Sequence, residues 1–303
     1  MKKTILLISG PTAVGKTSLA IQLAKQFNTE IISADSRQCY KEISIAVAKP
    51  STTELNEVKH YFINSHSIHE NLNAASFEAY AINAVKEIFQ LHDIAIMVGG
   101  TGLYIKAFCE GMDEIPTVEE SIRIQLQNNY QQFGIEWLKQ QLHNHDSLFA
   151  KEGEMQNPQR MLRALEVVLS TGKSILQYRK GAKRERNFNI IKIGLELPRQ
   201  ELYDRINHRV DEMMNEGLPD EAKDLFPNRH LNALQTVGYR ELLDYLDGTI
   251  SLEKAVELIK QNSRHYAKRQ LTWFKRDEEI KWFHPTQLQE IISYLKEQIK
   301  KPE

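Results

Sequence analysis

The sequence predicts an α/β fold: a parallel sheet flanked by helices, with an all-helical domain inserted into it. Three observations support this expectation. An apolar run over residues 4–9 leads directly into a glycine-rich loop and an amphipathic helix. Further apolar runs then alternate with helical periodicity, which is the order of a parallel β-α-β sheet. Strand signals disappear between about residues 112 and 186.

The elements of the sheet follow one another along the chain. We expect strands over residues 4–9, 30–33, 94–98 and 190–197, and helices over residues 16–27 and 74–91. The run over 94–98 is apolar throughout and is bounded by Gly99-Gly100, which is typical of a strand that is buried on both faces. From Arg199 onward the sequence again predicts mainly helices.

The helical segment has its own start and stop signals. A helix is expected over Ser121–Phe133, after Pro116. Another begins at Asn157-Pro158, with asparagine as the N-cap and proline at the first helical position, and ends at Gly172. The predicted organisation is therefore a catalytic core of residues 1–111 and 187–303 and a helical insertion of residues 112–186.

Composition narrows the class of protein. No apolar stretch reaches the roughly 18 residues of a membrane span, and the run over residues 4–9 is too short for a signal peptide. The two cysteines, Cys39 and Cys109, lie far apart and outside any ligand motif. These features predict a protein of the reducing cytoplasm with no membrane partner, disulfide framework or structural zinc.

Charge is unevenly distributed although the net charge is only −1. Residues 111–155 carry three basic and eight acidic groups, whereas residues 156–186 carry eight basic and two acidic groups. A basic block of this kind suits binding to a phosphate backbone. It would equally suit the solvated face of a helix, and composition alone does not decide between the two.

A phosphate-binding loop follows the first predicted strand, and it makes the expected fold P-loop NTPase-like. Glycines let the backbone curl so that its N–H groups face an anion, and the following helix N-terminus adds partial positive charge. Lys16 would reach the outer phosphate, and the Thr17 hydroxyl would hold Mg²⁺. The P-loop consists of Gly10, Pro11, Thr12, Ala13, Val14, Gly15, Lys16 and Thr17.

Asp35 is the candidate carboxylate of the core. P-loop ATPases often end an apolar strand with an aspartate that binds Mg²⁺, but here the strand over 94–98 ends in glycines. Asp35 follows the second predicted strand, and the carboxyl ends of parallel strands converge on the ligand crevice. It should therefore face the P-loop. An aspartate here could also simply cap a loop or helix, and a small-molecule kinase would share this plan.

Seven segments in this order resemble the bacterial tRNA dimethylallyltransferase family. The resemblance runs from the P-loop to about residue 283 and departs from the family at Ala46-Val47, where Gly-Thr is usual. No added zinc-finger segment of the kind found in some eukaryotic relatives is seen. The segments are Gly10–Thr17, Asp35-Ser36-Arg37-Gln38, Ala48-Lys49-Pro50, Gly99-Gly100-Thr101-Gly102-Leu103-Tyr104, Asn157-Pro158-Gln159-Arg160, Val237-Gly238-Tyr239 and Tyr266–Phe274.

This resemblance implies transfer of a dimethylallyl group from its diphosphate to N6 of the adenine at tRNA position 37, with Mg²⁺ as cofactor. Asp35 would accept the proton of the attacking amine. Thr101 would help position the reacting groups. Arg205 matches the family's phosphate-binding arginine, although on its own it looks like an ordinary surface arginine. The resemblance also suggests a monomer.

The resemblance further implies a set of tRNA contacts. The helical insertion would bind the anticodon stem-loop, and the target base would leave its stack to reach the diphosphate. The implied tRNA-binding residues are Asp35, Ser36, Arg37, Gln38, Thr101, Arg123, Gln159, Arg160, Met161, Leu162 and Arg163. Residues 264–276, with five basic residues, three aromatics and no acid, suit RNA contact or a packed helix with a charged face.

Three other functions compete with this prediction. A P-loop kinase of a small metabolite leaves the basic block unexplained. An adenylate prenyltransferase that acts on free nucleotides has the same difficulty. If the protein only bound RNA, without catalysis, the P-loop facing Asp35 would have no function.

Overall fold

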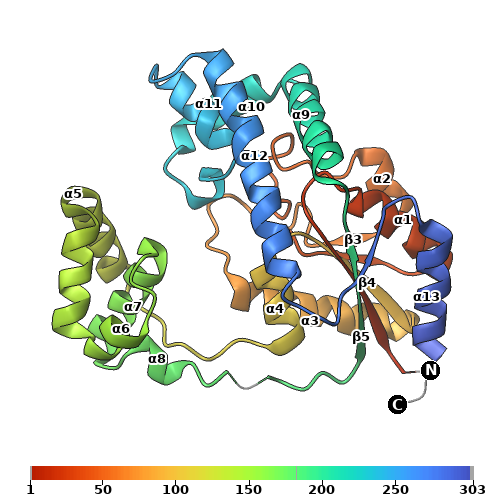
Figure 1. Cartoon of the computed structure of the whole chain (residues 1–303), viewed down its shortest axis with the longest axis horizontal. Helices are drawn as coiled ribbons and strands as arrows, with labels where there is room; N and C mark the ends of the chain where they lie inside the picture. The colour runs from red at the N-terminus through yellow and green to blue at the C-terminus, as the bar shows by residue number, and fades with distance from the viewer. Residues whose placement is uncertain (1, 182, 301–303) are drawn as a thin grey trace. The chain divides into compact units, whose positions relative to one another are not determined.

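The computed structural model describes residues 2–181 and 183–300 and contains a six-stranded parallel sheet with helices on its faces (Figure 1). Its strand order is β3-β2-β4-β1-β5-β6, and every adjacent pair is parallel. The predicted α/β fold is confirmed. The strands are β1 (Thr4–Ser9), β2 (Ile31–Ser33), β3 (His60–Tyr61), β4 (Ile94–Val98), β5 (Asn189–Leu195) and β6 (Lys281–Phe283).

The central strand β1 fixes the register of the sheet. Ile5 lies opposite Ala95 of β4 on one side and Ile190 of β5 on the other. The strands predicted over 4–9 and 94–98 have the expected bounds, and those predicted over 30–33 and 190–197 differ by one or two residues. The edge strands β3 and β6 were not predicted because two or three residues show no periodicity.

Helices and short turns of the core connect these strands. The helix predicted over 74–91 has the expected bounds, and Asn73 caps it by accepting from Ala75 N and Ser76 N. The helices are α1 (Lys16–Phe27), α2 (Thr52–Glu57), α3 (Ala74–Leu91), α4 (Gly102–Glu110), α9 (Arg199–Asn215), α10 (Leu218–Leu225), α11 (Tyr239–Leu246), α12 (Leu252–Phe274) and α13 (Leu288–Lys300), with 3₁₀ turns η1 (Phe226–Asn228) and η2 (Asn232–Leu234).

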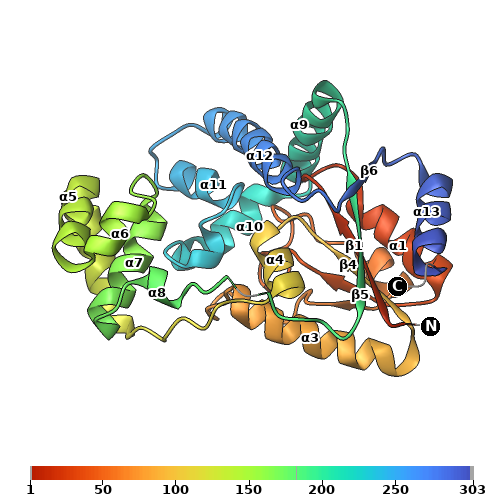
Figure 2. The same ribbon diagram turned by 60° about the horizontal axis from the view of Figure 1, so that its bottom comes forward.

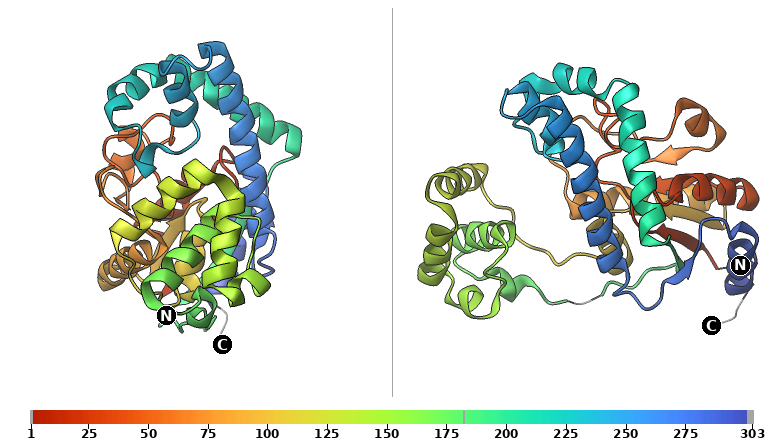
Figure 3. Two further views of the ribbon diagram at one scale, coloured as in Figure 1. Left: turned by 90° about the vertical axis from the view of Figure 1, so that its left-hand side faces the viewer. Right: turned by 45° about the horizontal axis from the view of Figure 1, so that its top comes forward.

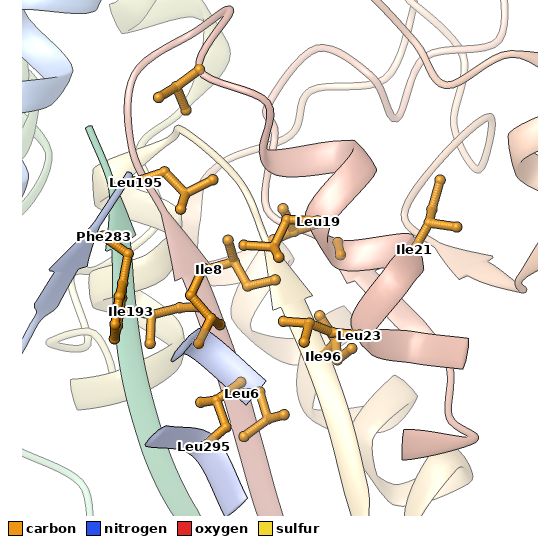
Figure 4. Close-up of a cluster of buried hydrophobic side chains, with 14 of the residues drawn as sticks. Leu6, Ile8, Leu19, Ile21, Leu23, Ile96, Ile193, Leu195, Phe283 and Leu295 are labelled. Carbon is orange, nitrogen blue, oxygen red and sulfur yellow. The ribbon is translucent and has the colours of Figure 1, made fainter. Parts of the chain in front are cut away.

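A hydrophobic core lies between the sheet and helices α1 and α13 (Figure 4). Leu6 and Ile8 of β1 are fully buried here against Leu23 of α1 and Leu295 of α13. Side chains alternate along a strand, so Ile5 and Leu7 point to the opposite face, where α3 packs on β4 (Figure 2). Both faces of the sheet are covered, which explains why its strands are continuously apolar.

Residues 110–184 form a second compact unit, and the core unit consists of the chain before and after it. The second unit is a bundle of α5 (Glu120–His145), α6 (Ser147–Glu152), α7 (Pro158–Thr171) and α8 (Ile175–Tyr178), visible in Figure 3. As predicted, Asn157 caps α7 by accepting from Gln159 N and Arg160 N, and Gly172, at φ 71°, ends it.

The long helix α5 is interrupted inside the second unit. Gly134 has φ 74° and ψ −166°, so two helical segments meet there. The helix predicted over Ser121–Phe133 is the first of these segments, with its start one residue earlier. Leu138 and Leu142 of the second segment are buried with Met161 and Leu165 of α7 in the core of this unit.

Among the described residues, no helix combines the length and apolar character that a membrane span requires.

Candidate active site

A pocket of about 360 Å³ lies at the carboxyl ends of the parallel strands. Several parts of the core unit line it: the P-loop after β1, the turn after β2, the loop before α2, the glycines after β4, and helices α2, α9 and α12. Chain crossovers leave the carboxyl ends of neighbouring strands open, and ligands of such sheets bind there. The lining includes Thr12, Ala13, Gly15, Lys16, Thr17, Asp35, Gln38, Val47, Lys49, Gly99, Gly100, Arg209, Tyr266 and Gln270.

The backbone of the P-loop has the curl that was expected of it. Gly10 has φ +144°, and a Cβ there would lie 2.7 Å from the Leu195 carbonyl oxygen. Gly15, at φ +100°, stands at the N-terminus of α1, and Ala13 also has a positive φ of 64°. Val14 points into the hydrophobic core and anchors the loop.

Among the cationic side chains that line this pocket, Lys16 and Arg209 bond to the P-loop. Lys16 Nζ donates to the Pro11 carbonyl over 2.7 Å, and Arg209 Nη2 donates to Thr12 Oγ1 over 2.7 Å. Burial lowers the pKa of Lys16 to about 8, with Asp35 opposing this shift and Arg209 adding to it. Burial also lowers the pKa of Arg209, which nevertheless stays protonated. Two partly desolvated cations beside backbone N–H groups favour a polyanion such as diphosphate.

Arg205, the arginine that the resemblance implies, does not line this pocket. Its Nη2 pairs with Glu201 over 2.8 Å, and its side chain is 41% exposed. It lines a neighbouring depression that shares Gly15 and Ser18 with the pocket. Arg205 and Arg209 are four residues apart on α9 and so share one face of that helix. Helical periodicity could not tell which of the two reaches the P-loop, and the structure brings Arg209 there.

Asp35 both caps a turn and lines the pocket. Its Oδ1 accepts from Arg37 N at 2.9 Å and from Gln38 N at 3.3 Å. These bonds orient the carboxylate toward the P-loop side of the turn, since Asp35 and Lys16 line the same pocket. The capping interpretation and the functional interpretation of Asp35 are therefore compatible. Ser36 and Arg37 are part of the same turn, but they do not line the pocket.

Thr101 joins the two loops that follow β2 and β4. Its Oγ1 accepts from Ser36 N at 3.0 Å and donates to Ser36 Oγ at 3.3 Å, and its own N–H donates to the Ala34 carbonyl. The hydroxyl of Tyr266 also bonds to Thr101, and burial raises the pKa of Tyr266. Thr101 thus holds the Asp35 turn in place through protein contacts.

The glycines after β4 make room for α12 and β2. A Cβ on Gly99 would lie 2.3 Å from the Ala34 carbonyl oxygen. On Gly100 it would lie 2.2 Å from Gln270 Nε2, and on Gly102 it would lie 2.3 Å from the Trp273 ring. Two sequence motifs that are some 170 residues apart therefore interlock, because a side chain in one would occupy the space of the other.

The Ala46-Val47 departure leaves the backbone contacts of its loop intact. Gln38 Nε2 donates to the carbonyls of Val47 and Ala48 at 3.2 and 2.9 Å. A Cβ on Gly238 would lie 2.7 Å from the Ala46 Cβ, so the two residues are tightly packed. Val47 lines the pocket and gives it an apolar wall.

The donors in the pocket suit magnesium. Mg²⁺ prefers oxygen ligands and usually takes only one or two from the protein, with phosphate and water supplying the others. The Thr17 hydroxyl and the Asp35 carboxylate line the same pocket as the P-loop. Within residues 2–181 and 183–300, no group of three or more His, Cys, Asp or Glu side chains is arranged to hold a metal ion.

Two of the implied tRNA-binding residues of the second unit share one acid. Arg123 Nε and Arg163 Nη1 both pair with Glu166, at 3.5 and 3.0 Å. Arg160 pairs with Glu154 and remains 54% exposed. The side chains of Met161 and Leu162 are buried in the core of this unit, so the polar residues of the segment are the ones available to a ligand.

Helix α12 carries an open basic and aromatic cavity of about 370 Å³ in the core unit. Trp273 is 37% exposed at this cavity, whereas Phe274 is 3% exposed and belongs to the core. Phe274 is therefore a packed residue of the helix, whereas Trp273 is accessible to a ligand. The cavity is lined by His265, Lys268, Arg269, Thr272, Trp273 and Arg276.

Known proteins are similar to this chain in sequence and in fold. The family model described as IPP transferase matches residues 38–277. The tRNA dimethylallyltransferase 1 of Bacteroides fragilis is 46% identical over 98% of this chain and 99% of its own length. The tRNA dimethylallyltransferase of Flavobacterium johnsoniae is 47% identical, again over 98% of this chain and 99% of its own length.

Solved structures agree with the sequence relatives. The tRNA isopentenylpyrophosphate transferase of Bacillus halodurans has a TM-score of 0.73 at 36% identity, covering 99% of this chain and 97% of its own. A eukaryotic dimethylallyltransferase acting on tRNA has a TM-score of 0.77 at 28% identity, covering 95% of this chain and 75% of its own. With a matching family model and full-length relatives of this similarity, the chain belongs to the IPP transferase family.

Proposed function

We propose that this chain transfers the dimethylallyl group of dimethylallyl diphosphate to N6 of the adenine at tRNA position 37, next to the anticodon, and releases diphosphate. One observation carries the proposal: the P-loop and Asp35 line the same pocket. A site for an anionic leaving group and a proton acceptor therefore face one space. The relatives named tRNA dimethylallyltransferase support these two substrates.

The residues divide the chemistry between them. The exocyclic amine of adenine is a weak nucleophile because its lone pair is drawn into the ring. As the nitrogen bonds to the allylic carbon, the carbon–oxygen bond to diphosphate breaks and the nitrogen becomes positive. Asp35 accepts the proton that the nitrogen then loses. Lys16, Arg209 and the P-loop N–H groups stabilise the negative charge on the departing diphosphate.

Magnesium completes the proposed anion site. The Thr17 hydroxyl would hold the ion, with phosphate oxygens and water as its other ligands. Bound there, Mg²⁺ supplies additional positive charge to the diphosphate oxygens. The oxygen donors of the pocket support this part of the proposal.

Separate basic surfaces on the two units support tRNA as the acceptor. The helical unit carries Arg123, Arg160 and Arg163 on polar parts of its surface, and we propose that it binds the anticodon stem-loop. The α12 cavity of the core unit combines basic side chains with the exposed Trp273, a combination that suits RNA phosphates and bases. The adenine must leave its stack to reach Asp35.

The two alternative enzymatic functions explain fewer features of the structure. A metabolite kinase would use the same P-loop, but it requires neither the basic helical unit nor the α12 cavity. An adenylate prenyltransferase would use the same pocket for a free nucleotide. The basic helical unit and the α12 cavity would then have no ligand. A single assay gives a different result for each of these functions.

The assay is mass spectrometry of an unmodified tRNA that carries an adenine 3′ to its anticodon. The tRNA is incubated with the protein, Mg²⁺ and dimethylallyl diphosphate, without ATP. We expect a mass gain of one dimethylallyl group on that adenine, and a gain about 10²–10⁴-fold slower with the Asp35→Asn variant. Modification of free adenine nucleotides alone would identify the adenylate prenyltransferase. No transfer to either acceptor, across several tRNAs, would refute the proposal and turn attention to phosphoryl transfer.

A further inference from the structure

Gln270 of α12 connects two loops of the pocket. Its side chain is buried, with 6% exposed. Oε1 accepts from Thr12 N at 2.8 Å, and Nε2 donates to the Gly100 carbonyl at 2.9 Å. Both partners are backbone groups, and one is a donor and the other an acceptor. The orientation of the amide is therefore determined, because the flipped amide would oppose donor to donor and acceptor to acceptor.

Gly100 is shaped for this contact. A Cβ at residue 100 would lie 2.2 Å from Gln270 Nε2, which is closer than real atoms approach. The backbone of Gly100 does not have a positive φ, so glycine is needed here for space rather than for conformation. The close approach lets one side chain reach both Gly100 and the P-loop.

The bond from Thr12 changes what the P-loop presents to a ligand. The N–H groups of such a loop ordinarily face the anion, but the Thr12 N–H is directed to Gln270. Thr12 is also the residue whose Oγ1 accepts from Arg209. A chain of contacts thus runs from Gln270 through the backbone of Thr12 to its hydroxyl and on to the guanidinium of Arg209.

We propose that Gln270 is a positioning residue that sets the start of the P-loop and, through Thr12, the guanidinium of Arg209 in the geometry that receives diphosphate. The inference rests on the proposed function, since diphosphate is the leaving group of that reaction. It adds a residue from α12 to an anion site otherwise built from the P-loop and α9. A residue that only filled space would affect stability and leave the affinity for diphosphate unchanged.

The test compares Gln270→Met with Gln261→Met, the same substitution at an exposed position of the same helix. Inorganic pyrophosphate binding is measured by calorimetry, and KM is measured separately for the prenyl donor and for tRNA. Because Gln270 makes two hydrogen bonds to neutral backbone groups, each worth roughly several-fold in an equilibrium constant, we expect pyrophosphate affinity to fall about tenfold in Gln270→Met. Donor KM should rise in parallel, whereas tRNA KM and the Gln261→Met variant should stay within about twofold.

A second variant tests the route through Thr12. Thr12→Val removes the hydroxyl that accepts from Arg209 and keeps the backbone N–H. If Gln270 acts through Thr12, the double variant should lose about as much pyrophosphate affinity as either single variant. Losses that multiply to about a hundredfold would overturn the route through Thr12. A folded Gln270→Met protein with wild-type pyrophosphate affinity and a lower Tm would reduce Gln270 to a structural residue.

Pyrophosphate binding separates this inference from the proposed function, because it requires no transfer. If the wild-type protein modified no tRNA yet the variants lost pyrophosphate affinity as expected, the prenyl transfer would be wrong and the positioning role would stand. If Gln270→Met failed to fold, Thr12→Val alone would still test whether the Thr12 link matters to the anion. Unchanged pyrophosphate affinity in Thr12→Val would then overturn the inference.

Discussion

Arg209 Nη2 donates to the Thr12 hydroxyl over 2.7 Å, and this bond joins helix α9 to the phosphate-binding loop. It places a guanidinium in the pocket that also holds Lys16. Arg205, one helical turn away, pairs instead with Glu201 on its own helix. Of these two neighbouring arginines, Arg209 is therefore the one that bonds to the loop.

Arg209→Lys should impair the reaction, and Arg205→Lys should not. A lysine at residue 209 keeps the charge but loses the planar fork that meets Thr12 and an anion together. We expect kcat/KM for the prenyl donor to fall by about 10²-fold in Arg209→Lys and to change less than about twofold in Arg205→Lys, as measured by steady-state transfer to tRNA. The reverse pattern would restore Arg205 as the phosphate-binding arginine.

Asp35→Asn should separate chemistry from folding. Asparagine keeps an Oδ1 that can accept from Arg37 N and Gln38 N, so the turn after β2 is retained. It cannot take a proton from the attacking amine, and we expect kcat to fall by about 10²–10⁴-fold. Steady-state transfer gives kcat, and filter binding gives tRNA affinity, which should stay near the wild-type value. Near-normal turnover would exclude Asp35 as the base.

Arg160→Glu should weaken tRNA binding. Reversing an exposed charge on the helical unit removes one phosphate contact, so the slope of log affinity against log salt concentration should become shallower by about one. Lys139→Glu is the matched control, because Lys139 also pairs with a nearby acid, Glu136, on the surface of the same unit. Equal effects of the two variants on the salt slope would show general charge attraction rather than a contact at Arg160.

Cys39 should be unreactive in the folded protein. Burial, with Asp35 adding to it, raises the pKa of the Cys39 thiol to about 12. Because the thiolate is the reactive form, labelling should stay slow as the pH rises from about 7 to about 9, far below that pKa. In urea the pKa returns to about 8.5 and labelling should become fast over the same range. Intact-mass analysis of a Cys109→Ser variant treated with iodoacetamide measures this, and equal rates with and without urea would contradict the burial of Cys39.

The sequence predicted the strands with the strongest signals because local chemistry specifies them. The apolar runs over 4–9 and 94–98 and the glycines of the P-loop encode buried parallel strands and a backbone turn wherever they occur in space. The cap at Asn157 and the stop at Gly172 depend on hydrogen bonds within a few residues. Edge strands of two or three residues carry no such signal and form because a neighbouring strand offers partners.

The sequence by itself determined the P-loop, placed Asp35 at the end of a strand and supplied the motifs that carry the family resemblance. Only the tertiary structure decided that Arg209 rather than Arg205 meets Thr12, and that Gln270 joins Thr12 to Gly100. The physical reason is the separation along the chain of the residues that interact. Caps, turns and periodicity follow from neighbours along the chain, whereas a contact between residues about 170 or more positions apart depends on how α9, α12 and the sheet pack.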